Sequence, residues 1–94
     1  SFRASLDAHF ALEEQVHFPA LHGLRPDFQS ELGELIREHL RFREDLARIE
    51  ASLGALEAEG AAADLLAAFR DLATRLRRHE EREEHLLARA GEAP

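Results

Sequence analysis

The longest regular pattern in the chain runs from Phe28 to Leu56, where large side chains recur at alternating steps of four and three residues. That alternation is typical of a helix packed in a bundle or coiled coil. The positions are Phe28, Leu32, Leu35, His39, Phe42, Leu46, Ile49, Leu53 and Leu56. All are apolar except His39, and an unpaired buried polar group costs about 1–3 kcal/mol. The stretch therefore predicts one long helix whose imidazole has a partner inside the bundle.

The same spacing occurs before and after this stretch. The earlier stripe consists of Phe2, Leu6, His9, Glu13, Val16 and Ala20. The later stripe consists of Ala62, Leu65, Phe69, Leu72, Leu76, His79, Glu83, Leu86 and Ala90. Helix-stopping glycines and a helix-starting proline place turns at 22–26 and 59–60, and Pro19 is expected to kink or fray the turn that contains it. We expect helices at about 1–20, 27–58 and 61–90, with Gly54 inside the second.

Composition agrees with a single all-α domain covering residues 1–94. Ala, Leu, Glu and Arg dominate the sequence, whereas β-branched residues are scarce. The connections are short, so consecutive helices must be antiparallel neighbours. The predicted fold is an up-down antiparallel helical bundle with three helices in this chain.

Charge and residue usage narrow the function classes. A net charge of −7 argues against a nucleic-acid partner, which requires a basic face. No apolar run approaches the roughly 20 residues of a membrane span, and no signal-peptide pattern is visible, so we expect a cytoplasmic protein without a membrane partner. The absence of cysteine excludes disulfides, thiolate zinc sites and iron–sulfur ligation.

Five polar residues interrupt the three apolar stripes: His9, Glu13, His39, His79 and Glu83. In an antiparallel hairpin, two residues lie level when they are equally far from the turn, which places the three histidines in one layer. The two glutamates lie one turn further along their helices, about 6 Å away. Imidazole nitrogens and carboxylate oxygens suit iron, manganese, zinc or cobalt, and buried carboxylates without a cation would repel each other. Histidines satisfied within the core and glutamates turned to the surface are the alternative, but five ligand types at one level favour a metal site.

Other polar residues are assigned to the surface, and the remaining aromatic residues to the core. His17, His22 and His85 lie off the stripes or in a turn and are interpreted as surface residues. A solvated face is expected for Glu14, Glu80, Glu81, Arg82 and Glu84. Phe10, Phe42 and Phe69 are expected in the core, with Phe42 a possible wall of the metal pocket.

These motifs resemble the hemerythrin-like HHE cation-binding domains. The resemblance covers essentially the whole chain and depends on His9-x-x-x-Glu13-Glu14 followed by Phe18-Pro19-Ala20-Leu21, on Glu38-His39, and on His79-x-x-x-Glu83-Glu84 followed by Leu86-Leu87. It implies a bundle that holds two non-haem iron ions, bridged by carboxylates and completed by histidines. It also implies binding of oxygen or a related small ligand, with roles in oxygen binding or sensing, or in nitric-oxide and iron handling.

The chain departs from the family pattern in two ways. The resemblance implies that residues 1–94 begin at the family's second helix, so we expect no counterpart of the first helix and its histidine ligand among them. It also has Arg43 where the invertebrate oxygen carriers place a second histidine, and a His79–Glu83 spacing of four where they have histidine and aspartate five apart. The chain is therefore more similar to the bacterial HHE type than to a dedicated carrier.

Three functions are compatible with this sequence. The leading hypothesis is a di-iron module that binds oxygen or a related diatomic ligand, with manganese or zinc as alternative metals. The others are a di-iron oxidase or peroxidase, and a structural or regulatory module with an incomplete metal site. Metal analysis separates the last from the first two, and turnover with peroxide or a reductant separates those two. Because small cores need support, we expect a homodimer or an additional N-terminal helix to complete the bundle.

Overall fold

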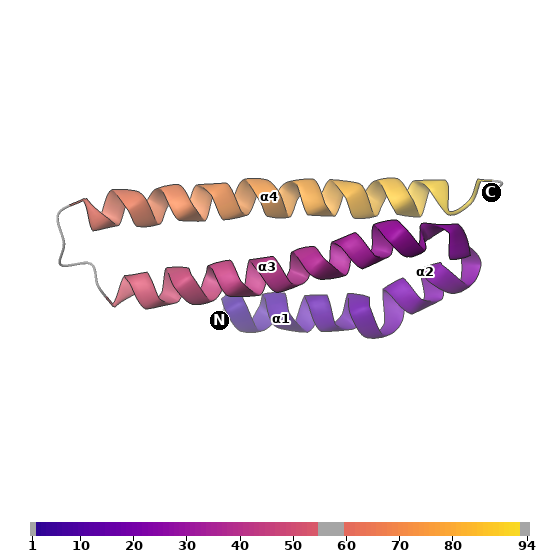
Figure 1. Cartoon of the computed structure of the whole chain (residues 1–94), viewed down its shortest axis with the longest axis horizontal. Coiled ribbons are helices and arrows are strands. Elements are labelled where there is room, and N and C mark those ends of the chain that lie inside the picture. Colours follow the sequence, from indigo (N-terminus) through magenta and orange to yellow (C-terminus); the bar gives the residue numbers. More distant parts are fainter. Residues whose placement is uncertain (1, 55–59, 93–94) are drawn as a thin grey trace.

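The computed structural model describes residues 2–54 and 60–92, and every regular element in these ranges is helical (Figure 1). The α-helices are α1 (Phe2–Leu12), α2 (Phe18–Leu24), α3 (Gln29–Leu53) and α4 (Ala61–Arg89). A π-helical turn, Glu13–His17, joins α1 to α2, and a 3-10 turn, Pro26–Phe28, joins α2 to α3. The structure therefore confirms the predicted all-α helical bundle.

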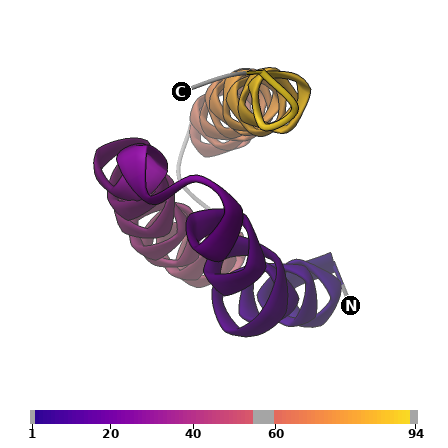
Figure 2. The same cartoon turned by 90° about the vertical axis from the view of Figure 1, so that its right-hand side faces the viewer.

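Helices α3 and α4 run antiparallel along most of an elongated molecule measuring 55 × 20 × 18 Å (Figure 1). Helices α1 and α2 form one continuous path that packs on only part of α3 (Figure 1). Viewed end-on, the three helical rods lie at the corners of a triangle (Figure 2). Within the described ranges, no helix combines the length and apolar character that a membrane crossing requires.

The apolar core consists of two clusters. One contains Leu6, Phe10, Phe42, Leu46, Ile49 and Leu72. The other contains Phe18, Leu21, Phe28, Leu32, Leu35 and Leu86. On α3 the first cluster begins after His39 and the second ends before it, so the polar layer lies between them. Burying each Leu or Phe side chain contributes about 1.5–3 kcal/mol, which makes these clusters the main source of stability.

The π-helical turn changes which residues of the first helical path face inward. The buried positions are Leu6, Phe10, Glu13, Phe18 and Leu21, with a five-residue step across the turn. The backbone N–H of Phe18 donates to the carbonyl of Glu13 five residues earlier, which widens the helix. The nearby Pro19 disfavours a regular α-helical turn because it has no N–H and its ring would clash with the carbonyl of Gln15.

The predicted inward positions Phe2 and His9, before the turn, and Val16 and Ala20, after it, are wrong, because all four are exposed. A regular period could describe only one side of the π-helical turn. The extra residue rotates everything after the turn by about 100°, which carries Phe18 and Leu21 inward in place of Val16 and Ala20. Phe10, predicted in the core, is fully buried.

The helix ends differ modestly from the predicted ones. The first helical path reaches Leu24, so His22 and Gly23 are helical rather than part of the turn. Helix α3 ends at Leu53 and Gly54 follows as its cap, which corrects the placement of Gly54 inside the helix. The predicted continuation to position 58, which includes Leu56, and the turn residue at 59 lie outside the described residues. Gly60 has a φ of 81°, the left-handed conformation that favours glycine, directly before α4.

Phe69 is 39% exposed, contrary to the prediction that it belongs to the core. It lines a shallow pocket with Phe2, at the beginning of α1, and with Leu72 on α4. Leu66, nearer the beginning of α4, is 50% exposed. The part of α4 before Leu72 therefore leaves these two large apolar side chains partly uncovered.

At the opposite end, Arg25 ties the α2–α3 connection to the end of α4. Its guanidinium donates to the backbone carbonyls of Arg89 at 2.6 Å and Glu92 at 3.0 Å. It also donates to both carboxylate oxygens of Asp27 and lies 4.4 Å from the centroid of the Phe28 ring. These contacts hold the α2–α3 connection against the C-terminal end of α4.

Candidate metal centre

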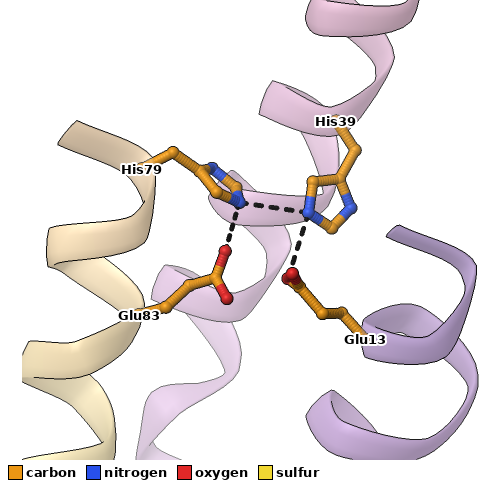
Figure 3. A group of neighbouring side chains, drawn as sticks. All are labelled: Glu13, His39, His79 and Glu83. Carbon is orange, nitrogen blue, oxygen red and sulfur yellow. Dashed lines mark hydrogen bonds and ion pairs between the residues drawn. The ribbon is translucent and has the colours of Figure 1, made fainter. Parts of the chain in front are cut away.

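Four of the five predicted ligands converge at one point in the bundle (Figure 3). Glu13 comes from the π-helical turn, His39 from the middle of α3, and His79 and Glu83 from α4. One ligating atom from each lies within 4.8 Å of the others. Three segments far apart in sequence thus supply two nitrogens and two carboxylates to one small volume.

The two imidazoles meet through the same ring atom. The Nε2 atoms of His39 and His79 are 3.1 Å apart. His39 Nε2 lies 3.3 Å from a carboxylate oxygen of Glu13, and His79 Nε2 lies 2.5 Å from one of Glu83. Each histidine therefore directs Nε2 toward the other histidine and toward a carboxylate (Figure 3).

His9, the fifth predicted ligand, lies at the edge of this group rather than inside it. Its side chain is 55% exposed, and its Nε2 lies 2.5 Å from Glu13 Oε1. The interior position beside His39 is taken by Phe10, whose ring stacks on that imidazole with centroids 3.9 Å apart. The predicted layer of three histidines therefore contains two buried rings, with the third touching the cluster through Glu13.

The carboxylate oxygens fit a cation. Glu13 is only 2% exposed, yet within residues 2–54 and 60–92 neither of its carboxylate oxygens has a well-oriented hydrogen-bond donor, and the same is true of Glu83 Oε1. The histidine nitrogens lie close to these oxygens but not in hydrogen-bonding geometry. Buried acceptors of this kind require compensation, and an ion with several coordination positions would contact the nitrogens and oxygens together.

The two glutamates differ in proton affinity. Burial raises the pKa of Glu83, and the adjacent Glu13 carboxylate adds to the rise against the opposing effect of His79. Burial also acts to raise the pKa of Glu13, but its close contacts with His39 and Glu83 and the charges of His9 and His39 outweigh burial and lower that pKa. One proton is therefore best held by Glu83, as expected when two carboxylates share a buried site.

His79 binds its proton more strongly than an ordinary histidine. Burial lowers its pKa, but the close contact with Glu83 and the charges of Glu83 and Glu38 outweigh burial and raise the pKa above 6.5. When protonated, this imidazole offsets the charge of the buried carboxylates. A metal ion would supply that charge instead.

Two further carboxylates contact the opposite faces of the histidines. His39 Nδ1 lies 3.2 Å from Glu14, and His79 Nδ1 lies 3.4 Å from Glu38. Sequence reasoning did not assign either residue to the site, although each directly adjoins a predicted ligand in the quoted motifs. Glu14 and Arg82, predicted on a solvated face, are 26% and 42% exposed, and both also belong to the ion-pair network around these histidines.

Aromatic rings surround the histidines. Phe42 meets the His79 ring edge-on with centroids 5.3 Å apart, which is consistent with its predicted place beside the pocket. Phe18 lies nearly parallel to the His39 ring at 5.7 Å. His17, His22 and His85 are exposed, as predicted.

One side of the cluster opens into an apolar groove of about 390 Å³. Glu13 and Glu83 are among its lining residues, and most of the others are Leu or Phe side chains from α2, α3 and α4. Leu24 and Leu87, on its rim, are 74% and 64% exposed. The groove thus connects the polar cluster to the outside through apolar walls.

Taken together, the helical bundle and its inward-facing histidines and carboxylates define a metal-binding bundle of the carboxylate type. The model of the hemerythrin HHE cation-binding domain matches residues 1–90, and the chain belongs to this family. Comparisons with curated proteins and with solved structures give no match.

Proposed function

We propose that this chain is a non-haem di-iron domain that binds oxygen or a related small ligand. The convergence of Glu13, His39, His79 and Glu83 is the observation that carries the proposal. Family membership supports cation binding in general, and the donor set narrows the choice of metal. Imidazole with carboxylate suits iron and also accommodates manganese or zinc, whereas calcium and magnesium prefer oxygen alone.

Each ligand has a distinct part in this proposal. Glu13 and Glu83 offer two oxygens each, so they can bridge two ions, and their charge offsets that of the metals. His39 and His79 supply neutral nitrogen donors from a dry interior. His9 supplies a further nitrogen at the exposed edge, next to Glu13. When bound, ferrous iron with open coordination positions supplies reversible binding of oxygen or similar small molecules.

The apolar groove supports a small, weakly polar ligand. It approaches the cluster from the side of Glu13 and Glu83. Its walls are mostly Leu and Phe side chains, which favour an uncharged molecule over a charged one. Low polarity around a metal site also limits access by water and strengthens electrostatic interactions within it.

Metal content and absorption of aerobically prepared protein test the proposal. The chain has no Tyr or Trp, so the metal-free form absorbs very little at 280 nm and metal bands stand against a weak background. We expect close to two iron atoms per chain and strong near-ultraviolet bands from oxygen-bridged ferric iron. Iron-reconstituted protein with well under one metal per chain and without such bands would contradict the proposal.

We further propose that a second copy of the chain covers the groove. Exposed leucines border it, and the two buried carboxylates Glu13 and Glu83 are among its lining residues. Apolar surface of this kind favours association, and two-fold pairing would shield both centres at once.

A further inference from the structure

Each buried histidine contacts a carboxylate through Nδ1, and an arginine donates a hydrogen bond to that carboxylate. His39 Nδ1 contacts Glu14 at 3.2 Å, and Arg43 donates to the same oxygen of Glu14 at 3.1 Å. His79 Nδ1 contacts Glu38 at 3.4 Å, and Arg82 donates to the same oxygen of Glu38 at 2.5 Å. We name these sets the Glu14 clamp and the Glu38 clamp.

The two clamps follow the same plan. In each, the arginine lies on the helix of the histidine it supports, and the carboxylate comes from a neighbouring segment. Each arginine also contacts a second carboxylate. Arg43 contacts Asp7 on α1, in the same continuous helical path as Glu14, and Arg82 contacts Glu34 on α3, the helix of Glu38. An arginine fork that holds two carboxylates has little freedom to turn, so the position of the first carboxylate is fixed.

A fixed carboxylate determines which nitrogen of a neutral histidine carries hydrogen. The carboxylate accepts a hydrogen bond from Nδ1–H, which leaves Nε2 as an unprotonated donor to a metal. His39 and His79 are 0% and 1% exposed, so water does not compete for Nδ1. Both Nε2 atoms then face the cluster with their lone pairs available.

We propose that Glu14 with Arg43, and Glu38 with Arg82, are positioning residues that hold His39 and His79 in the Nδ1–H tautomer and orient Nε2 toward the metals. The effect on metal affinity depends on the proposed function. The effect on the tautomer does not, because it is present in the metal-free chain.

The chain offers a matched control for the Glu14 clamp. Glu14 and Glu84 occupy the same place in the two His-x-x-x-Glu-Glu motifs. Glu84 is exposed on α4, whereas Glu14 is half-buried and contacts His39. If the motif alone were responsible, substitution of Glu14 and substitution of Glu84 would have equal effects. If the clamp is responsible, only the substitution of Glu14 should have an effect.

Nitrogen NMR of the metal-free chain tests the tautomer directly, at a pH above the range in which the imidazoles titrate. In the wild type, we expect Nδ1 of His39 to carry hydrogen and Nε2 to show the shift of an unprotonated nitrogen. Glu14→Ala should give a mixture of tautomers at His39. Arg43→Met should also increase the fraction of His39 with hydrogen on Nε2. Glu84→Ala and Arg41→Met, at exposed positions, should leave the spectrum unchanged.

Titration with Co²⁺ tests the consequence for binding. Loss of a carboxylate behind a metal-bound histidine typically lowers affinity by about 10–100-fold, and we expect Glu14→Ala to fall in this range. Glu14→Gln keeps an acceptor for Nδ1–H and should recover most of the loss, whereas Glu84→Ala should match the wild type. Circular dichroism of each variant establishes that the helices remain folded.

The outcomes separate the clamp from the proposed function. An unchanged tautomer and unchanged Co²⁺ affinity in Glu14→Ala would overturn the clamp. A wild-type chain that binds neither cobalt nor iron would overturn the metal site. A tautomer shift in Glu14→Ala would still support the clamp in that case.

Discussion

The Nε2 atoms of His39 and His79 lie 3.1 Å apart in the bundle interior, although the residues are 40 positions apart in sequence. If both rings donate Nδ1–H to their carboxylates, two unprotonated nitrogens face each other at this distance. Their lone pairs repel unless a positive charge lies between or beside them. A proton on His79, whose pKa is raised, can supply that charge, and a metal ion can replace it.

Removing one of these rings should abolish metal-dependent stability. A ligand that binds only the folded chain stabilises it by about 2.7 kcal/mol at 100-fold excess over Kd. In a domain of this size that corresponds to a rise in Tm of roughly 10 °C or more. We expect His39→Ala to lose this metal-induced rise, because a nitrogen donor is missing. Thermal melts with and without iron measure it.

His85→Ala is the matched control for this experiment. His85 lies on α4 as His79 does, but its side chain is exposed and it does not belong to the convergent group. It should keep the full metal-induced rise in Tm. Equal losses in the two variants would contradict the assignment of ligands.

The metal-free and metal-bound forms should respond to pH in opposite directions. The folded chain raises the pKa of His79 above 6.5, so it binds that proton more tightly than the unfolded chain does. This contribution to the free energy of unfolding is fully present below pH 6.5 and is lost as pH rises through the raised pKa. Metal binding requires unprotonated nitrogens, so the metal-induced stability should instead disappear on acidification.

Denaturant unfolding across the imidazole range measures both trends. The metal-free chain should lose stability with rising pH, and the difference between metal-bound and metal-free chains should grow. His79→Gln should flatten the trend of the metal-free chain. Parallel curves for the two forms of the wild type would contradict this account of the site.

Substitution of Arg25 should lower stability without touching the ligands. Arg25→Met removes the hydrogen bonds to the carbonyls of Arg89 and Glu92, leaving them without this donor. We expect a lower Tm in the metal-free chain and a cobalt Kd close to that of the wild type. Arg41→Met, at an exposed position on α3, should change neither quantity.

Low pH should weaken the ion pair between Arg25 and Asp27. The Arg25 guanidinium holds the pKa of Asp27 below its ordinary value through a bidentate hydrogen bond. The stability from this pair is present above the ordinary aspartate pKa of 3.8 and is lost as pH falls through the lowered value. In a double-mutant cycle, the coupling between Arg25→Met and Asp27→Asn should therefore be measurable at neutral pH and vanish in acid.

Pairing through the groove should depend on its exposed leucines. We expect light scattering to give a dimer for the metal-loaded chain at micromolar concentration. Leu87→Arg, on the rim of the groove, should give a monomer, because a charged side chain opposes burial of that surface. Leu66→Arg, which is also exposed on α4 but outside the groove, should remain dimeric. A wild-type monomer with full metal content and a sharp melt would refute the pairing.

The sequence alone determined the helices α3 and α4 and predicted four of the side chains that converge at the candidate site. Every predicted inward residue of α3 from Leu32 to Ile49 is buried, because a regular helix keeps its period over this length. His39, His79, Glu13 and Glu83 were found as polar interruptions of apolar stripes, and short turns were enough to place them near one another. These conclusions needed only helical geometry and the cost of burying an unpaired polar group.

The tertiary structure decided what depends on helix rotation and on neighbouring segments. The π-helical turn moved Phe18 and Leu21 inward and could not be read from a regular period. At the other end of the path, Phe10 rather than His9 took the interior place beside His39. Glu14 and Glu84 occupy the same position in the two His-x-x-x-Glu-Glu motifs, so the motif alone did not distinguish them. Only the packing of the π-helical turn against α3 placed Glu14 behind His39, because a contact between helices depends on their relative rotation as well as on residue spacing.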